Sequence, residues 1–174
     1  MTLNELNELL QEAAYTTFMQ CCTASRWVDA MVSSRPFQSL QQCQDRALEH
    51  WSEMQEDDLL EAFAGHPKIG DVNSLRKKYA ATKALASGEQ SSVNVADERT
   101  LQGLADGNTA YEQQNGFIFI VCATGKSAAE MLQLLEDRLR NDRSVELAIA
   151  AEQQSQITAL RIAKLITTDE EKSL

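Results

Sequence analysis

The sequence predicts an all-α fold, and three observations lead to this prediction. The 174 residues include only seven glycines and two prolines. Residues that favour helices, such as Ala, Leu, Gln and Glu, are abundant throughout. Long stretches place apolar side chains three and four positions apart, which is the spacing of one helix face. We therefore expect one compact helical bundle of about eight to ten helices over residues 1–166, followed by an acidic tail at 167–174.

The first part of the chain predicts five helices. The capping-box spacing of Thr2–Glu5 starts the first helix, and its apolar stripe continues into a second. A third helix is ended by Pro36, because proline cannot continue a helical hydrogen-bond ladder. A fourth covers about 37–51, with Leu48 among its inward residues. A fifth begins with the acidic run 56–58, which suits the positive end of a helix dipole.

The second part predicts four more helices, which start or run at about 74, 96–113, 127–141 and 144–166. Gly116 ends the second of these, and a second capping-box spacing at Ser127 opens the third. Between them, residues 117–123 form a continuous apolar run rich in aromatic and β-branched side chains. Since the sequence offers no second strand, we expect this run to cross the core as a buried extended or helical segment.

Charge and cysteine usage narrow the functional class. A net charge of −10 argues against nucleic-acid binding and means that an anionic substrate needs locally placed positive charge. The four cysteines show neither CxxC pairs nor Cys/His ligand spacing, so no metal site is expected. Reduced thiols and the lack of a signal-peptide pattern suit a cytoplasmic protein. No apolar run is long enough to cross a bilayer, so no membrane association is expected.

His66 lies in the stretch Ala64–Asp71, which places one of the two histidines beside one of the two prolines. Histidine is the side chain whose ordinary pKa lies near neutrality. Pro67 restricts the residue before it to extended conformations, so the imidazole should lie on a stiff, non-helical bend. A polar loop between helices is the alternative interpretation. His50 falls within a helix, and we expect it to be a packed or partly exposed histidine.

Three further side chains could work with such a histidine. A carboxylate such as Glu89 can hold a tautomer and raise the imidazole pKa. The guanidinium of Arg161 can bind a carboxylate or a urea-like group through paired donors. The amide of Gln90 offers a donor and an acceptor to a heterocycle. Spacing alone does not bring these residues together, and each could equally be a surface or structural residue.

The stretch Ala62–Asp71 resembles the His-Pro motif of the 2-oxo-4-hydroxy-4-carboxy-5-ureidoimidazoline (OHCU) decarboxylases, enzymes of urate breakdown. Four further pieces match the family in order. They are Cys21-Cys22 with Trp27, Met31 and Arg35-Pro36-Phe37; Glu89-Gln90; Gly116-Phe117 through Thr124-Gly125-Lys126-Ser127; and Ile157-Thr158-Ala159-Leu160-Arg161. The resemblance extends over about residues 3–166, nearly the whole chain.

This resemblance implies a cofactor-independent carboxy-lyase, without metal, that forms a homodimer and converts OHCU to (S)-allantoin. It implies His66 and Glu89 as catalytic residues, with His66 the general acid/base. It implies substrate contacts at Pro67, Ser87, Gln90, Phe119, Ile120, Val121, Cys122, Ala123 and Arg161. Family members often carry a serine three residues before the glutamate. Here that residue is Ala86, and Ser87, one position later, is expected to substitute.

Two other classes of function remain open at this point. One is a helical binding module that resembles the family but has lost catalysis. The intact set of His66, Glu89 and Arg161 argues against this alternative. The other is a metal-assisted hydrolase that uses His50, His66 and Asp71, although these residues lack a recognised ligand spacing.

Overall fold

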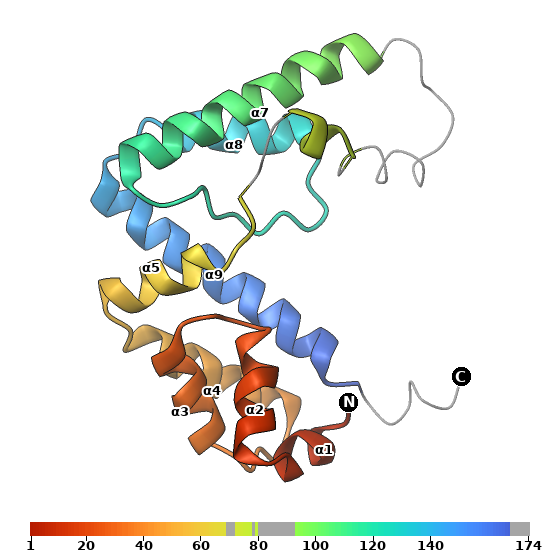
Figure 1. Ribbon diagram of the computed structural model, residues 1–174, viewed down its shortest axis with the longest axis vertical. Coiled ribbons are helices and arrows are strands. Elements are labelled where there is room, and N and C mark those ends of the chain that lie inside the picture. The colour runs from red at the N-terminus through yellow and green to blue at the C-terminus, as the bar shows by residue number, and fades with distance from the viewer. Residues whose placement is uncertain (69–71, 78, 80–92, 168–174) are drawn as a thin grey trace. The chain divides into compact units, whose positions relative to one another are not determined.

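A computed structural model describes residues 1–68, 72–77, 79 and 93–167, and in these residues the secondary structure is helical, without strands (Figure 1). The predicted all-α class is therefore confirmed. The chain divides into two compact units. The first unit is Met1–His66 with Ala151–Leu174, and the second unit is Pro67–Ala150. The long last helix, α9 (Arg143–Leu165), contributes to both. None of the described helices is both long and apolar enough to cross a membrane.

The first unit contains five short helices and the C-terminal part of α9. They are α1 (Leu3–Glu8), α2 (Gln11–Met19), α3 (Ser25–Ser33), α4 (Leu40–Ser52) and α5 (Glu56–Ala64). The capping box at Thr2 and Glu5 is confirmed, with Glu5 N donating to Thr2 Oγ1 and Thr2 N donating to Glu5 Oε2. The guanidinium of Arg35 donates to the carbonyls of Leu6 and Leu9 and so satisfies the open end of α1.

The core of the first unit is built around Trp27, which is fully buried. Phe18 meets the Trp27 ring edge-on at a centroid distance of 6.2 Å, and the indole Nε1 donates to the carbonyl of Ala47. Burying the indole therefore leaves no unsatisfied donor. The expectation that Leu48 points inward is wrong, because 59% of this residue is exposed. Cys43, Ala47 and Trp51 of the same helix are buried, as their places in the stripe predict.

The second unit contains helical residues at 72–77 and 79, α7 (Val93–Asn115), α8 (Ala128–Arg138) and the start of α9. Gly116 follows α7 with a positive φ of 79°, a conformation that glycine adopts readily. Ser127 caps α8 by accepting from Glu130 N, although α8 ends at Arg138, earlier than expected.

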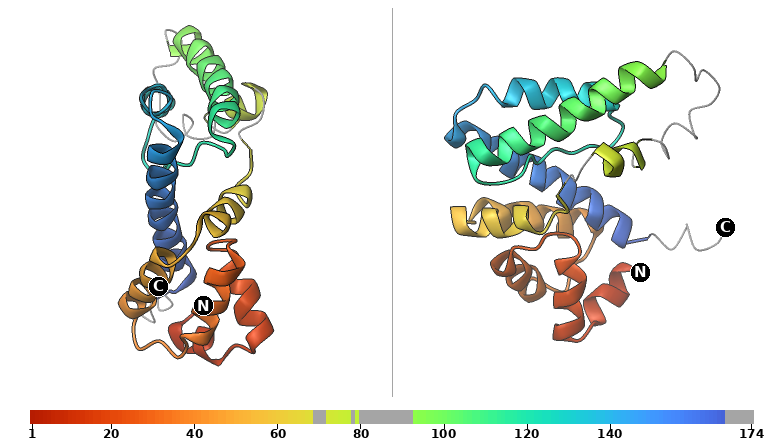
Figure 2. Two further views of the ribbon diagram at one scale, coloured as in Figure 1. Left: turned by 90° about the vertical axis from the view of Figure 1, so that its left-hand side faces the viewer. Right: turned by 45° about the horizontal axis from the view of Figure 1, so that its top comes forward.

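The helices α7 and α8 run side by side (Figure 2). Their close approach depends on two glycines of α7, Gly103 and Gly107, which lie against Leu132 and Leu135 of α8. A Cβ atom at Gly107 would come within 2.6 Å of Leu135 Cδ2. Small residues one turn apart thus let the two helix backbones come close together.

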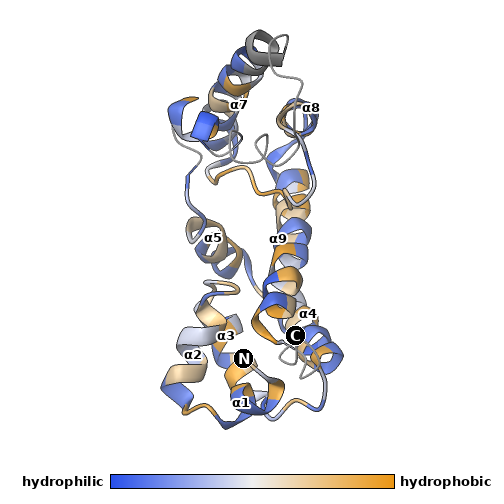
Figure 3. Ribbon diagram, turned by 90° about the vertical axis from the view of Figure 1, so that its right-hand side faces the viewer, coloured by the Kyte–Doolittle hydropathy of each residue, from blue (hydrophilic) through white to orange (hydrophobic). Residues whose placement is uncertain are grey.

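Residues 117–123 form a hydrophobic segment that is neither helix nor strand (Figure 3). The sequence left open whether this segment is extended or helical, and the structure shows that it is not helical. Phe117, Phe119, Ile120 and Cys122 are buried, whereas the other three residues are partly exposed, so the segment is less buried than expected. Because a buried segment without strand partners cannot satisfy its own carbonyls, it needs donors from elsewhere in the protein.

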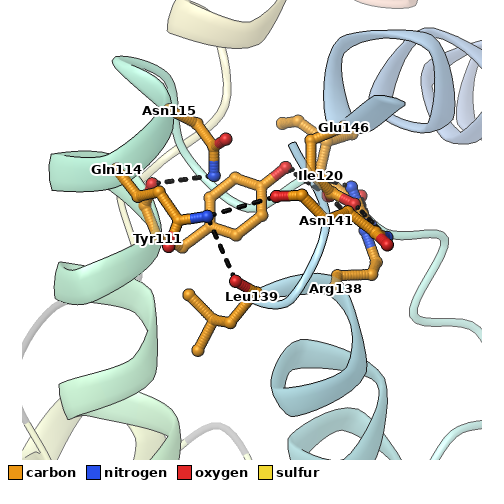
Figure 4. Close-up of polar contacts among 8 residues, drawn as sticks. All are labelled: Tyr111, Gln114, Asn115, Ile120, Arg138, Leu139, Asn141 and Glu146. Carbon is orange, nitrogen blue, oxygen red and sulfur yellow. Dashed lines mark hydrogen bonds and ion pairs between the residues drawn. The ribbon is translucent and has the colours of Figure 1, made fainter. Parts of the chain in front are cut away.

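A buried polar network supplies such a donor (Figure 4). Arg138 Nη1 donates to the carbonyl of Ile120, and Arg138 Nε donates to Glu146 Oε1 at 2.7 Å. The same carboxylate accepts from the hydroxyl of Tyr111 at 2.6 Å and from Asn141 Nδ2 at 2.9 Å. Burial, followed by the bond to Glu146, raises the pKa of the Tyr111 hydroxyl, which therefore stays protonated and donates. The network thus ties α7, α8 and α9 to the 117–123 segment.

Candidate active site

His66 lies immediately after α5, on the bend that the sequence predicts. The backbone N–H of His66 donates to the carbonyl of Phe63, which continues the last turn of the helix. Gly65 closes this turn against Thr23, whose hydroxyl donates to the carbonyls of Glu61 and Ala62. A Cβ atom at Gly65 would lie 2.0 Å from Thr23 Oγ1. Only glycine therefore fits here without displacing Thr23, and this contact fixes the backbone position from which the His66 side chain extends.

The ring of His66 pairs with Gln154 of α9 through Nε2 and Oε1, which are 2.5 Å apart. Gln154 is fully buried, and its own Nε2 donates to Thr158 Oγ1 at 3.1 Å. Sequence reasoning missed Gln154. The available signal was that Gln154, Thr158 and Arg161 recur at i, i+4 and i+7, so that three polar residues share one face of the helix.

Arg161 lies on the same face of α9 and is half-buried. Its Nη1 donates to the carbonyl of Cys21 at 3.3 Å. The guanidinium also lies close enough to His66 to lower the pKa of the imidazole. The structure thus brings together two predicted site residues, His66 and Arg161, within the first unit.

The electrostatics of this site favour a neutral imidazole. Burial is the largest influence and lowers the pKa of His66 from its ordinary value of 6.5. The hydrogen bond to Gln154 opposes this shift, whereas the positive charge of Arg161 adds to it. At neutral pH the ring is therefore mostly uncharged and able to accept a proton.

The neighbouring thiols are not nucleophiles. Burial raises the pKa of Cys22 to about 11, against the opposing effects of hydrogen bonds from Ala24 and from the hydroxyl of Thr158. Burial also raises the pKa of Cys21 to about 11. Both sulfurs are therefore protonated at neutral pH and are poor nucleophiles.

The other predicted site residues are distributed as follows. Pro67 is exposed and is the first residue of the second unit. Phe119–Ala123 also belong to the second unit, where the Arg138 network holds the Ile120 carbonyl. Ser87, Glu89 and Gln90 lie outside the described residues.

The ligands proposed for a metal site do not form a described cluster. His50 is half-buried, as expected of a packed histidine, and its Nε2 lies 2.7 Å from Ser34 Oγ. Asp71 lies outside the described residues. Among the residues that the structure does describe, no group of three His, Cys, Asp or Glu side chains could hold a metal ion.

A separate pocket of about 320 Å³ opens between α4 and α9. Its walls combine two tryptophans from the core with polar residues of both helices: Trp27, Trp51, Gln44, Asp45, Ser155 and Gln156. Neither His66 nor Arg161 lines it, so this pocket is distinct from the site around the histidine.

The helical fold and the neighbouring His66 and Arg161 define a site suited to proton transfer on an anionic small molecule. Residues 7–163 match the sequence profile of the OHCU decarboxylase family. Because this match extends over most of the chain, the protein belongs to the OHCU decarboxylase family.

Individual relatives agree with this assignment. The chain is 38% identical over 148 residues to the uric acid degradation bifunctional protein TTL of Arabidopsis thaliana, covering 84% of this chain and 45% of that protein. It thus spans less than half the length of that relative. It is 26% identical over 166 residues to the 2-oxo-4-hydroxy-4-carboxy-5-ureidoimidazoline decarboxylase of Halalkalicoccus jeotgali, covering 95% of this chain and 92% of that protein.

A solved structure shows the same fold. The crystal structure of an OHCU decarboxylase in the presence of (S)-allantoin superposes with a TM-score of 0.69 and is 37% identical. The similarity covers 87% of this chain and 97% of the crystallised one. The relationship therefore extends over almost the whole of that protein.

Proposed function

We propose that this protein is a carboxy-lyase that decarboxylates OHCU to (S)-allantoin in the degradation of urate. The observation that carries the proposal is the nearness of the Arg161 guanidinium to the His66 imidazole in a member of the OHCU decarboxylase family. These are the proton-transfer group and the cation that such a reaction needs. Arg161 provides positive charge for an anionic substrate in a protein whose net charge is −10.

The reaction suits a protein that relies on its own side chains. When the carbon–carboxylate bond breaks, CO2 leaves, and its electron pair passes to the adjacent ring imine of the substrate. The substrate thus provides its own electron sink. The enzyme must orient the carboxylate, stabilise the developing charge and deliver one proton to one face of the carbon. In this proposal His66 is the general acid/base, Glu89 acts with it, and Arg161 anchors the substrate.

The family pattern supports further assignments. We assign substrate contacts to Pro67, Ser87, Gln90 and residues 119–123 because they occupy the matching motifs. Residues 1–166 would act as one catalytic domain, since the family match spans 7–163, and 167–174 would be an acidic tail. The protein would work as a cytoplasmic homodimer. The cysteines, all four free and buried, agree with a reducing compartment.

The test is to follow chiral allantoin formation by circular dichroism after adding freshly generated OHCU. We expect the unmodified protein to accelerate it, His66→Ala to lose most of the acceleration, and His50→Ala to retain it. The two variants remove the same side chain, so their difference isolates the role of the site. Full activity in His66→Ala would overturn the proposed role of His66. An unmodified protein that binds OHCU without turning it over would instead indicate a binding module.

A further inference from the structure

The contacts of His66 determine which ring nitrogen carries the proton. In the described part of the chain, the hydrogen bond of the imidazole is made by Nε2 to Gln154. The same glutamine donates to Thr158 Oγ1. Gln154 and Thr158 are both buried, so their polar atoms need partners within the protein.

The contact between Gln154 and Thr158 sets the orientation of the glutamine amide. A glutamine side chain can turn either its oxygen or its nitrogen toward a partner. Here Gln154 Nε2 donates to Thr158 Oγ1 at 3.1 Å, so Gln154 Oε1 faces the histidine. Since this oxygen can only accept, the ring nitrogen opposite it must carry a proton.

We propose that Gln154 is a positioning residue that holds His66 in the Nε2-protonated tautomer, so that Nδ1 is the nitrogen that exchanges a proton with the substrate. The part of this proposal that concerns proton exchange with the substrate rests on the proposed function. In the resting enzyme Nδ1 offers a lone pair. When a proton arrives there, Nε2 keeps its own proton and its bond to Gln154, so the ring does not have to turn.

A glutamine suits this role better than a carboxylate would. A carboxylate at the same place would fix the same tautomer but would also hold the ring as imidazolium. Gln154 carries no charge, so the ring stays neutral beside the cation Arg161. Around this group, the other described titratable side chains are Cys21 and Cys22, which are protonated thiols, and Glu61, which lies near Cys22.

The tautomer can be measured directly, without substrate. His50→Gln leaves a single histidine, so nitrogen–proton correlation spectra of the ¹⁵N-labelled protein then report only the His66 ring. We expect the neutral ring to carry its proton on Nε2. Adding Gln154→Leu should release this preference and yield a mixture of tautomers. A parent ring protonated on Nδ1, or a tautomer that Gln154→Leu leaves unchanged, would overturn the proposal.

The kinetic test separates positioning from a purely structural role. Gln154→Leu should lower kcat about 10- to 100-fold, as loss of an orienting partner commonly does, with little change in KM. Gln154→Glu retains an acceptor of nearly the same size, so it should restore much of kcat at pH values above the raised His66 pKa. It should also move the acidic limb of the pH profile to higher pH, because the carboxylate raises the His66 pKa. An unmoved pH profile in Gln154→Glu contradicts the proposal, even if Gln154→Leu does not fold.

The two proposals can fail independently. If the His50→Gln protein decarboxylates OHCU but its His66 ring is protonated on Nδ1, the assignment of Gln154 fails and the proposed function stands. If that ring is protonated on Nε2 but no decarboxylation is seen, the proposed function fails and the tautomer assignment stands.

Discussion

Glu146→Gln should destabilise the protein strongly, although it keeps the size of the side chain. The carboxylate of Glu146 is fully buried and accepts from Tyr111, Arg138 and Asn141. The amide removes the counter-charge of Arg138, whose side chain is only 8% exposed. Leaving a buried charge without its partner costs about 3–5 kcal/mol. In a protein of this size, each kcal/mol lowers Tm by about 2–4 °C, so we expect a fall of roughly 6–20 °C.

The matched control is Glu112→Gln, the same substitution in an exposed ion pair of the same unit. Glu112 Oε1 lies 2.8 Å from Lys68 Nζ, but the two side chains are 39% and 72% exposed. Exposed pairs contribute at most about 1 kcal/mol. Thermal unfolding followed by circular dichroism, with urea titrations alongside, compares the two variants. If Glu146→Gln lowers Tm no more than Glu112→Gln does, the reasoning about the buried network is refuted.

Three further predictions concern the histidine site. Gly65→Ala should destabilise the protein by about 1–3 kcal/mol, because the new Cβ meets Thr23 Oγ1 at 2.0 Å. Adding Thr23→Ala should recover part of that loss in urea titrations, and simple additivity of the two changes would count against the clash. Arg161→Gln should raise KM for OHCU by about tenfold or more, since a charged hydrogen bond contributes about 1.5–3 kcal/mol. Steady-state assays, together with a thermal unfolding curve of the variant, check this. A lowered Tm with unchanged KM would indicate a structural role for Arg161. Burial lowers the His66 pKa in the folded protein, so the unfolded chain binds more protons, and the free energy of unfolding should decline as pH falls through about 6.5. Urea titrations across this range should show a smaller decline in His66→Asn than in the unmodified protein. An equal decline in the two proteins would argue against a lowered His66 pKa.

Local features of the fold could be predicted because they depend on residues within one helical turn. The capping box at Thr2 and Glu5, the cap at Ser127 and the glycine after α7 each act on a neighbouring backbone group. The bend at His66 likewise follows from the proline beside it and from the end of α5. These predictions needed no knowledge of packing.

Features that depend on distant partners could not be predicted in the same way. Residues 117–123 look like a strand by propensity, but no strand occurs among the described residues to pair with them, and the carbonyl of Ile120 accepts from Arg138 of α8 instead. Leu48 fits an inward helical stripe, yet 59% of it is exposed, whereas Cys43, Ala47 and Trp51 of the same helix are buried. Which residues of such a stripe are covered depends on the elements that pack against the helix.

The sequence by itself determined the all-α class and the positions of most described helices, and its motifs singled out His66 and Arg161 as candidate site residues. Only the tertiary structure identified Gln154, which is 88 positions from His66 along the chain and yet bonded to its ring. The physical reason is that a helix start or a bend is set by neighbouring residues, whereas the proton on an imidazole is set by whichever acceptor the folded chain places against it.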